Sequence, residues 1–520
     1  MQQESRLQSF LNNPARAMWS MAIPIVAGMM VQTLFNIVDI MFIAWWDMIG
    51  PNYEYQSMQD LIAKVLDQME KIKVNGYDNQ NLGVGVVSVG LVSPLFFIII
   101  GLTVGLGAGV TASIAQYIGK KDKKNADNCA QHAVFLGVII TLFLTVLGVY
   151  FGEDLLRLLG AEDSRILSTA YSYLEILIFG IGGVVFSLFF RAILAGEGET
   201  KIPMIIGLVG TMSNLVLDPI FIFILGKGVD GAAIATVLSQ VVMLAMYFFV
   251  IFIMKKTFLS FDFSRFHYSP SILKMIFVIG IPSSLSMLIM SFGQAVMNKI
   301  LINYDSYQVI GQKGYTIAKV GAELKSNGVI IMPALGEAYV AAYQIVSRID
   351  MLLFMPCLGI AIALTSIVGM FFGAKEFSKL VWVVKYGISS AIIITVVSVI
   401  ILFLSAEKIL PLFSSNQEVL SVGITYLKII ALVYPIVAIS VICARTCQAL
   451  GKGMPLLVVT IVRVLLLTAP LSLYFRARGF DIEWVWYSQV FAIFIATFIS
   501  FLFMQFYFKK FGIVRTVSKS

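Results

Sequence analysis

Two acidic residues lie deep within long apolar runs of the sequence. Asp39 falls in the run 18–46, three residues after Asn36, and Asp218 falls in the run 202–226, four residues after Asn214. Residues spaced by three or four lie on one face of a helix, so each acid has an amide beside it. Because an Asp at the centre of a membrane helix costs roughly 2.5 to 3.5 kcal/mol to insert, deep acids are the first candidates for function.

A carboxylate that is kept from water is stabilised by a proton, a cation or hydrogen-bond donors. Carboxylate, amide and hydroxyl oxygens are also the ligands that hard cations prefer. Thr236, in the next apolar run, can add a hydroxyl to such a set. We therefore predict a site for a proton or a hard cation at Asp39, Asn214, Asp218 and Thr236. The structural alternative is that each acid caps or crosslinks helices.

The apolar runs that carry these residues are long enough to cross a membrane as helices. The chain has 520 residues, of which 59% are hydrophobic and 13% are charged. The runs do not alternate with period two, as the strands of a membrane barrel do. They fall near residues 18–46, 82–118, 131–152, 166–195, 202–226, 231–254, 271–302, 338–372, 383–405, 420–450, 454–475 and 484–508. The sequence predicts an all-α membrane protein with twelve transmembrane helices.

An even number of spans places both termini on one side of the membrane. Lys and Arg are about twice as dense in the segments of that side as in the others, so the positive-inside rule puts both termini in the cytoplasm. The net charge of +8 comes from basic residues that flank the spans, and it does not indicate a nucleic-acid partner. No cleavable signal peptide is evident before the first span. We expect a multi-pass protein of the plasma membrane that acts as a monomer.

The two halves of the sequence resemble each other. Ala22-Ile23-Pro24 opens the first span, and Gly280-Ile281-Pro282 opens the seventh. We predict two pseudo-symmetric six-helix bundles around a central cleft, an N-terminal lobe at residues 1–260 and a C-terminal lobe at 261–520. Repeats with an even number of spans are parallel, which is typical of transporters that rock two bundles about a cleft.

Two external segments, at about 47–81 and 303–337, follow the first span of each half. In the first of them, apolar residues recur at three- and four-residue spacing with charges between, which indicates an amphipathic helix. We interpret it as a surface helix packed on the rim. The alternative is a lid or partner-docking surface over the external mouth.

Motifs of soluble enzymes are missing from the sequence: it has no P-loop, no dinucleotide fingerprint and no HExxH. Its two histidines lie at loop positions, and its four cysteines lie in or beside apolar runs, which favours packing over metal binding. We therefore predict that the protein is not an enzyme and needs no cofactor besides a coupling ion.

The sequence resembles the multidrug and toxic compound extrusion (MATE) family, in its DinF-like prokaryotic type. The resemblance covers nearly the whole chain apart from the two external segments. It is carried by Asn36-Ile-Val-Asp39, Leu82-Gly83, Gly196-Glu-Gly198-Glu-Thr-Lys-Ile-Pro203, Asn214-Leu-Val-Leu-Asp218-Pro219 and Leu335-Gly336-x3-Val340-Ala-Ala342-Tyr343-Gln344-Ile345.

This resemblance implies that small, often cationic, drug-like compounds are exported by alternating access in exchange for H⁺ or Na⁺. It implies that the coupling ion, including Na⁺ where Na⁺ is used, binds at Asp39, Asn214, Asp218 and Thr236. Pro24 matches a proline associated with bending of the first helix. Side chains that can line the cavity are Gln32, Asn36, Gln344 and Arg348, although Arg348 can instead pair with Asp350.

The sequence departs from many relatives of this family in its second half. Those relatives carry acids in the seventh and tenth helices, whereas the runs 271–302 and 420–450 hold no Asp or Glu. We therefore expect no acidic site in the second half.

Two other functions fit parts of the sequence. A flippase for lipid-linked precursors, from the same superfamily, shares the architecture, but such proteins usually carry more cationic residues in the cavity. Two intramembrane acids also suggest an aspartyl protease, but the Gly-x-Gly-Asp signature of those enzymes is absent.

Overall fold

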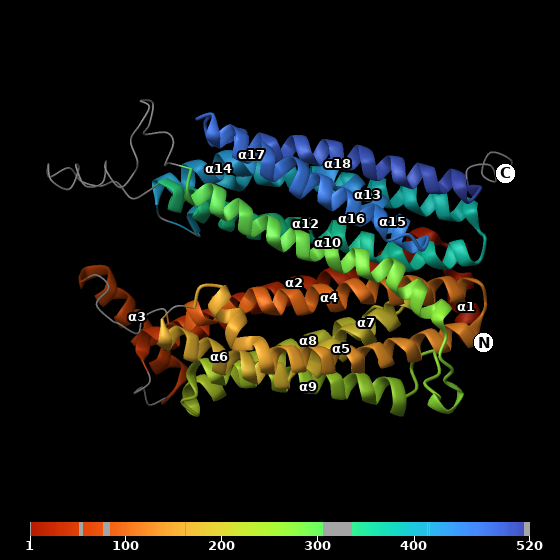
Figure 1. Ribbon diagram of the computed structural model, residues 1–520, viewed down its shortest axis with the longest axis horizontal. Coiled ribbons are helices and arrows are strands. Elements are labelled where there is room, and N and C mark those ends of the chain that lie inside the picture. Colours follow the sequence, from red (N-terminus) through yellow and green to blue (C-terminus); the bar gives the residue numbers. More distant parts are fainter. Residues whose placement is uncertain are drawn as a thin grey trace. The chain divides into compact units, whose positions relative to one another are not determined.

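The computed structural model describes residues 2–50, 56–75, 84–161, 163–304, 335–412, 414 and 416–513 (Figure 1). These residues are almost entirely helical, and no strand occurs among them. The helices are α1 (Gln2–Asn12), α2 (Pro14–Ile49), α3 (Met58–Asn75), α4 (Val84–Gly119), α5 (Lys123–Leu158), α6 (Ser164–Phe179), α7 (Ile181–Gly196), α8 (Lys201–Pro219), α9 (Gly228–Phe248), α10 (Pro270–Ile302), α12 (Leu335–Gly373), α13 (Phe377–Ile409), α14 (Gln417–Ala431), α15 (Tyr434–Ala449), α16 (Met454–Ile461), α17 (Ala469–Ala477) and α18 (Glu483–Lys510).

The described helices account for the predicted twelve spans. Ten of them, some with a short π-helical extension, are long and apolar enough to cross a membrane, and two bent pairs bring the number to twelve if each pair is one span. The pair α6–α7 bends by 50°, and the pair α14–α15 bends by 53°. The prediction of an all-α protein with twelve membrane helices is confirmed.

Corresponding spans of the two halves share the same irregularities. The bent pairs are the fourth span of each half. The fifth span of each half contains a π-helical segment, η1 (Ile220–Ile224) after α8 and η5 (Val462–Thr468) between α16 and α17. Because π-helical segments are rare and occur often at functional sites, they direct attention to the residues beside them.

The chain divides into two compact units. Unit 1 contains residues 1–9 and 23–280, and unit 2 contains residues 10–22 and 281–520. The divisions at 22/23 and 280/281 fall inside α2 and α10, next to Pro24 and Pro282. The lobe boundary at 260/261 stays a prediction.

The segment between α2 and α4 contains the helix that the apolar pattern predicts. Leu61 and Val65 of α3 are buried against Phe42, Ile43 and Phe223 of unit 1. The next residues along α3, Ile62 and Leu66, are 41% and 60% exposed. The helix therefore packs on unit 1 through one side, as expected of a surface helix. Most of the second predicted segment, residues 305–334, lies outside the described residues.

Asp47 at the end of α2 fixes the start of α4. Its two carboxyl oxygens accept hydrogen bonds from the backbone N–H groups of Gly85, at 3.1 Å, and Val86, at 3.0 Å. These N–H groups lie in the first turn of α4 and have no partner within their own helix. Asp47 thus caps α4 from another span and ties the second span of unit 1 to the first.

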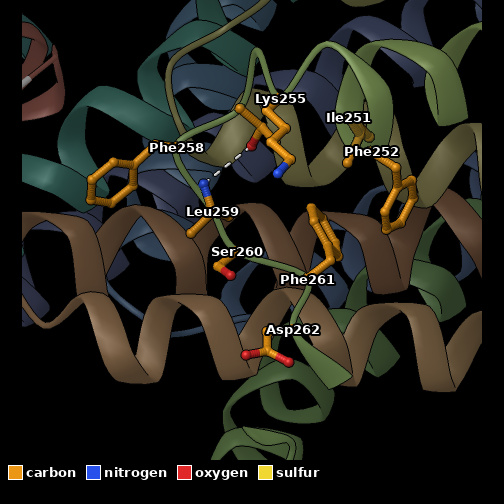
Figure 2. A pocket seen from close by; sticks show the side chains of 9 residues that line it. Ile251, Phe252, Lys255, Phe258, Leu259, Ser260, Phe261 and Asp262 are labelled. Atoms are coloured by element: carbon orange, nitrogen blue, oxygen red, sulfur yellow. Dashed lines mark hydrogen bonds between the residues drawn. The ribbon is translucent and has the colours of Figure 1, made fainter. Parts of the chain in front are cut away.

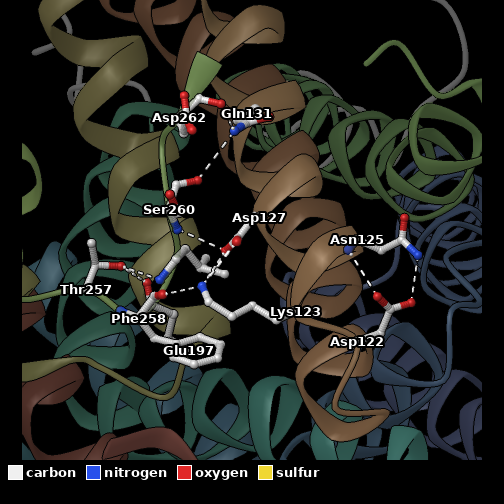
Figure 3. Close-up of polar contacts among 11 residues, drawn as sticks. Asp122, Lys123, Asn125, Asp127, Gln131, Glu197, Thr257, Phe258, Ser260 and Asp262 are labelled. Carbon is white, nitrogen blue, oxygen red and sulfur yellow. Dashed lines mark hydrogen bonds and ion pairs between the residues drawn. The ribbon is translucent and has the colours of Figure 1, made fainter. Parts of the chain in front are cut away.

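The segment that connects α9 to α10, residues 254–269, is held against one face of α5. Lys123 Nζ donates to Phe258 O at 2.8 Å, Ser260 N donates to Asp127 Oδ1 at 2.9 Å, and Gln131 Nε2 donates to Asp262 O at 3.0 Å (Figure 3). The three α5 residues are spaced by four, so they lie on one side of the helix. The connecting segment is therefore a fixed part of unit 1.

Candidate functional site

The two predicted residues of α8 form a buried pair. Asp218 is 1% exposed and Asn214 is 9% exposed, and both lie one turn apart on the same face. Asn214 Nδ2 donates a 3.1 Å hydrogen bond to Asp218 Oδ1. The amide thus satisfies one of the two oxygens of the acid.

Asp39 of α2 meets Asp218 of α8. The two carboxyl groups lie close enough to share a hydrogen bond. Two ionised carboxylates can only accept, so a hydrogen bond between them forms only when one of the acids is protonated. Asp39 Oδ1 and Asp218 Oδ2 are buried and have no hydrogen-bond partner among the described groups. The site therefore offers two free acidic oxygens to a proton or a cation.

The backbone next to Asp218 departs from regular α-helix. Pro219 follows the acid and cannot donate a helical hydrogen bond. Beyond it, Leu225 N donates to Ile220 O at 2.8 Å, five residues back, and Lys227 N donates to Phe221 O at 3.0 Å. The hydrogen-bond pattern of the span therefore changes directly after the carboxyl group.

Tyr173 also lies near the two acids, although no sequence pattern singles it out. This tyrosine lies in α6, the first half of the bent fourth span, and interacts electrostatically with both Asp39 and Asp218. It also packs against two hydrophobic clusters of unit 1. An aromatic residue in an apolar span gives no sequence signal of this role, because most such residues pack against other helices or lipid.

The other residues predicted for the first half have no described hydrogen bond to the two acids. Thr236 lies on α9, which packs against α8, and its side chain makes no hydrogen bond to either acid among the described residues. Gln32 is exposed, and the side chain of Asn36 lies outside the described part of the chain. Pro24 is a buried residue inside α2.

The two residues predicted to line a cavity in the second half differ from each other. Gln344 Nε2 donates a 3.1 Å hydrogen bond to Asn298 Oδ1 of α10, and Arg348 is exposed. No described ion pair joins Arg348 to Asp350; the partner of Asp350 is Tyr434, whose hydroxyl donates to Asp350 Oδ1. Tyr434 belongs to the tenth span, so an acid of the eighth span reaches the run 420–450, which has no Asp or Glu of its own.

No group of three or more His, Cys, Asp or Glu side chains could hold a metal ion in the described ranges. The four cysteines, Cys129, Cys357, Cys443 and Cys447, are free and buried.

A different polar site lies at the end of α7, outside the spans. Glu197 is 2% exposed; its carboxylate accepts a hydrogen bond from the Thr257 hydroxyl and one from Phe258 N at 2.9 Å (Figure 3). Burial raises the pKa of Glu197 to about 7; the Thr257 and Phe258 hydrogen bonds and Arg6 oppose this shift, and Glu199 adds to it. Glu197 therefore changes its charge close to neutral pH.

The connecting segment also borders an open pocket of about 400 Å³. Figure 2 shows its lining, which combines apolar side chains such as Phe252 and Phe261 with Lys255 and Asp262. The pocket lies in unit 1 but shares no residue with the Asp39–Asp218 site.

The chain matches the family model described as MatE at residues 83–220 and 328–474. It is 26% identical to a protein of Thermotoga maritima named "Probable multidrug resistance protein NorM", over 72% of this chain and 75% of that one. It is also 26% identical to the "Probable multidrug resistance protein YoeA" of Bacillus subtilis, over 83% and 89%.

Solved structures resemble the whole chain. A crystal structure of MATE in the bent conformation superposes with a TM-score of 0.80 at 28% identity, covering 98% of this chain and 99% of the other. A crystal structure of MATE in the straight conformation superposes with a TM-score of 0.79 at 29% identity, covering 96% and 97%.

Proposed function

Because this chain belongs to the MatE family of multidrug efflux transporters, we propose that it exports small organic cations in exchange for H⁺ or Na⁺. Members of this family are transporters of small molecules and not enzymes, and this chain is one of them. The observation that supports the exchange is the contact between the buried carboxyl groups of Asp39 and Asp218, each with an oxygen that lacks a donor.

The pair can couple two fluxes because it has one negative charge to neutralise. A proton or Na⁺ at the acids removes the attraction for a cationic substrate, and loss of that ion restores it. If the ion and the substrate favour opposite access states, binding of one promotes release of the other. Asn214 keeps Asp218 oriented during this exchange, and the π-helical segment after Pro219 gives the fifth span a place to adjust.

The two candidate ions use the site differently. A proton needs only the contact between the two acids. Na⁺ needs several oxygen ligands. We propose that they come from the two acids, the side-chain carbonyl of Asn214 and the hydroxyl of Thr236. A Thr236→Val substitution therefore separates the ions, because it weakens coupling to Na⁺ and leaves coupling to H⁺.

Orientation and location form part of the proposal. The excess of Lys and Arg in alternate loops supports two cytoplasmic termini and a position in the plasma membrane. We further propose that one chain suffices, because both acids, Asn214 and Thr236 lie in one unit.

Reconstitution in vesicles tests the exchange. The fluorescent cation ethidium is followed while a difference in pH or in Na⁺ is imposed across the membrane. Wild-type protein is expected to build an ethidium gradient, whereas Asp39→Asn and Asp218→Asn are expected to lose it while remaining folded. Asp154→Asn, which changes an exposed acid at the end of α5, is the matched control. Normal gradients with both site variants would reject the mechanism.

The same vesicles address the flippase alternative. The deep charged groups of unit 1 are acids, which repel the phosphates of a lipid-linked precursor. We expect no translocation of a pyrophosphate-linked lipid. Translocation without dependence on either ion would reverse the assignment.

A further inference from the structure

Unit 2 contains an acid that contacts the break in a bent span. Asp350 lies in α12, and Tyr434 is the first residue of α15, directly after the bend of 53° between α14 and α15. The Tyr434 hydroxyl donates a hydrogen bond to Asp350 Oδ1. Transporters often build ion sites where a span is interrupted, because the chain ends there provide polar groups. The pair thus links a carboxyl group to a position at which a span can change its bend.

No described ion pair neutralises this acid. The ion pairs among the described residues do not include Asp350. The titratable groups that face it are phenols: Tyr343 of its own helix, Tyr426 of α14 and Tyr434 of α15. Of the ionisable side chains of α13, Lys385, Glu407 and Lys408 are exposed, and Lys379 and Tyr386 are partly exposed. An ionisable group inside a span that lacks a counter-charge is a functional candidate by default.

One cation is near the same group of tyrosines. Arg463 lies in the π-helical segment η5 and interacts electrostatically with Tyr343. It makes no ion pair with Asp350 among the described residues. Its positive charge opposes a further positive charge nearby, a metal ion and a proton alike.

Buried N–H groups near the acid also disfavour a metal ion. Tyr343 stacks on Trp486 with ring centroids 6.2 Å apart, and Tyr426 lies 4.2 Å from the same ring. Trp486 is fully buried, yet its Nε1 has no partner among the described groups, nor has Nε2 of Gln489. These groups are donors, which suit water and not a cation. The acid itself has one phenol oxygen beside it, fewer than a hard cation requires.

We infer that Asp350 is a second proton-carrying group of this transporter, an inference that rests on the proposed exchange. The carboxylate takes one H⁺ from the solution on the side with more protons and becomes a neutral acid. It later gives the same H⁺ to the other side, and no bond to the substrate forms. Protonation weakens the charge-assisted bond from Tyr434, so it changes the contact at the break in the tenth span.

A structural role for the same pair predicts a different pattern of variants. If Asp350 only crosslinks α12 to α15, Asp350→Asn is tolerated, because the amide oxygen still accepts from Tyr434. Tyr434→Phe is then the harmful substitution, since it removes the hydrogen-bond donor of the crosslink. A proton-carrying role predicts the reverse for coupling: Asp350→Asn loses one proton per cycle, and Tyr434→Phe keeps it.

The test measures how many protons are coupled. Full-length protein is reconstituted in vesicles with Na⁺ equal on both sides and the membrane potential held at zero by valinomycin and equal K⁺. The steady-state ethidium gradient is measured against the imposed pH difference. Each coupled proton multiplies this gradient by about tenfold per pH unit.

We expect the Asp350→Asn gradient to be about tenfold smaller than the wild-type gradient at a difference of one pH unit. Tyr434→Phe and the matched control Tyr426→Phe are expected to keep the wild-type slope. If Asp350→Asn does not fold, the double variant Asp350→Leu/Tyr434→Phe replaces both partners with apolar groups and gives the same readout.

Three results would overturn the inference. The first is an unchanged slope in Asp350→Asn or in the double variant. The second is a wild-type protein driven by a Na⁺ difference alone, which leaves the proposed exchange standing without a second proton. The third is a wild-type protein that responds to neither ion, in which case the exchange and the inference fall together.

Discussion

Asn214 donates a hydrogen bond of 3.1 Å to Asp218, one turn further along the same helix, and both side chains are buried. The bond fixes one oxygen of Asp218 and leaves the other available near Asp39. A short polar contact within a single helix thus prepares an acid for a partner from another span.

Removing this donor is expected to impair transport more than stability. Asn214→Ala leaves Asp218 without its oriented hydrogen bond, and a bond to a charged group contributes about 1.5 to 3 kcal/mol. We expect the rate of coupled ethidium efflux to fall by about tenfold or more. Ser213→Ala is the control, because the one described bond of the Ser213 hydroxyl is to Val209 O of its own helix. Equal rates for the two variants would contradict a role for Asn214.

Glu197 is expected to make stability depend on pH. Its pKa is raised by burial from 4.5 to about 7, so the folded state binds the proton more tightly than the unfolded state does. Its contribution to stability is therefore complete below pH 4.5 and is lost as pH rises through about 7. The full change corresponds to about 3 kcal/mol.

The check on Glu197 is thermal unfolding in detergent between pH 4.5 and 8. Glu197→Gln keeps an acceptor for Phe258 N, and we expect it to remove most of this pH dependence and to raise the Tm at pH 8. Glu153→Gln, an exposed acid of α5, is expected to follow the wild-type curve. A wild-type curve from Glu197→Gln would show that the buried acid does not titrate in this range.

Asp47 is expected to stabilise unit 1 through the start of α4. Asp47→Ala removes the acceptor for two backbone N–H groups, and loss of a helix cap typically costs about 1 kcal/mol. The Tm should fall by a few degrees while efflux persists. Ser57→Ala removes an exposed cap on α3 and is expected to have a smaller effect, and the reverse order would refute the assignment.

The cysteines are expected to be unreactive in the folded protein. All four are free thiols and each is 0% exposed, so a water-soluble maleimide should label them only after unfolding. Leu158→Cys places a thiol at a position that is 82% exposed and provides the positive control. Labelling of Cys129 or Cys357 in native protein would mean that water reaches those helices.

The spans were predictable because each crosses the membrane as one long apolar run, and length alone identifies it. The bends within α6–α7 and α14–α15 were not, because the apolar run continues through both of them. The π-helical segment after Pro219 has a proline beside it, but a proline alone does not distinguish a kink from a change of helix type.

The candidate site, like the fold, was predictable from the sequence only in part. The cost of burying a charge singled out Asp39 and Asp218 without knowledge of the fold, because few sequences carry such residues in a span without use for them. The contacts of Tyr173 and the bond between Tyr434 and Asp350 depend on which helices pack together. The lack of acids in the runs 271–302 and 420–450 could not reveal that an acid of the eighth span reaches Tyr434.

Pro24 and Pro282 mark where α2 and α10 pass from one compact unit to the other. At neither point does a loop separate the units, so any rotation between them has to be absorbed as flexure of an intact helix. A proline backbone nitrogen carries no hydrogen, and each helix lacks one rung there. Each helix is therefore easier to bend at its proline than elsewhere. Replacing either proline with Ala restores the missing hydrogen bond and should slow turnover without changing the ion site.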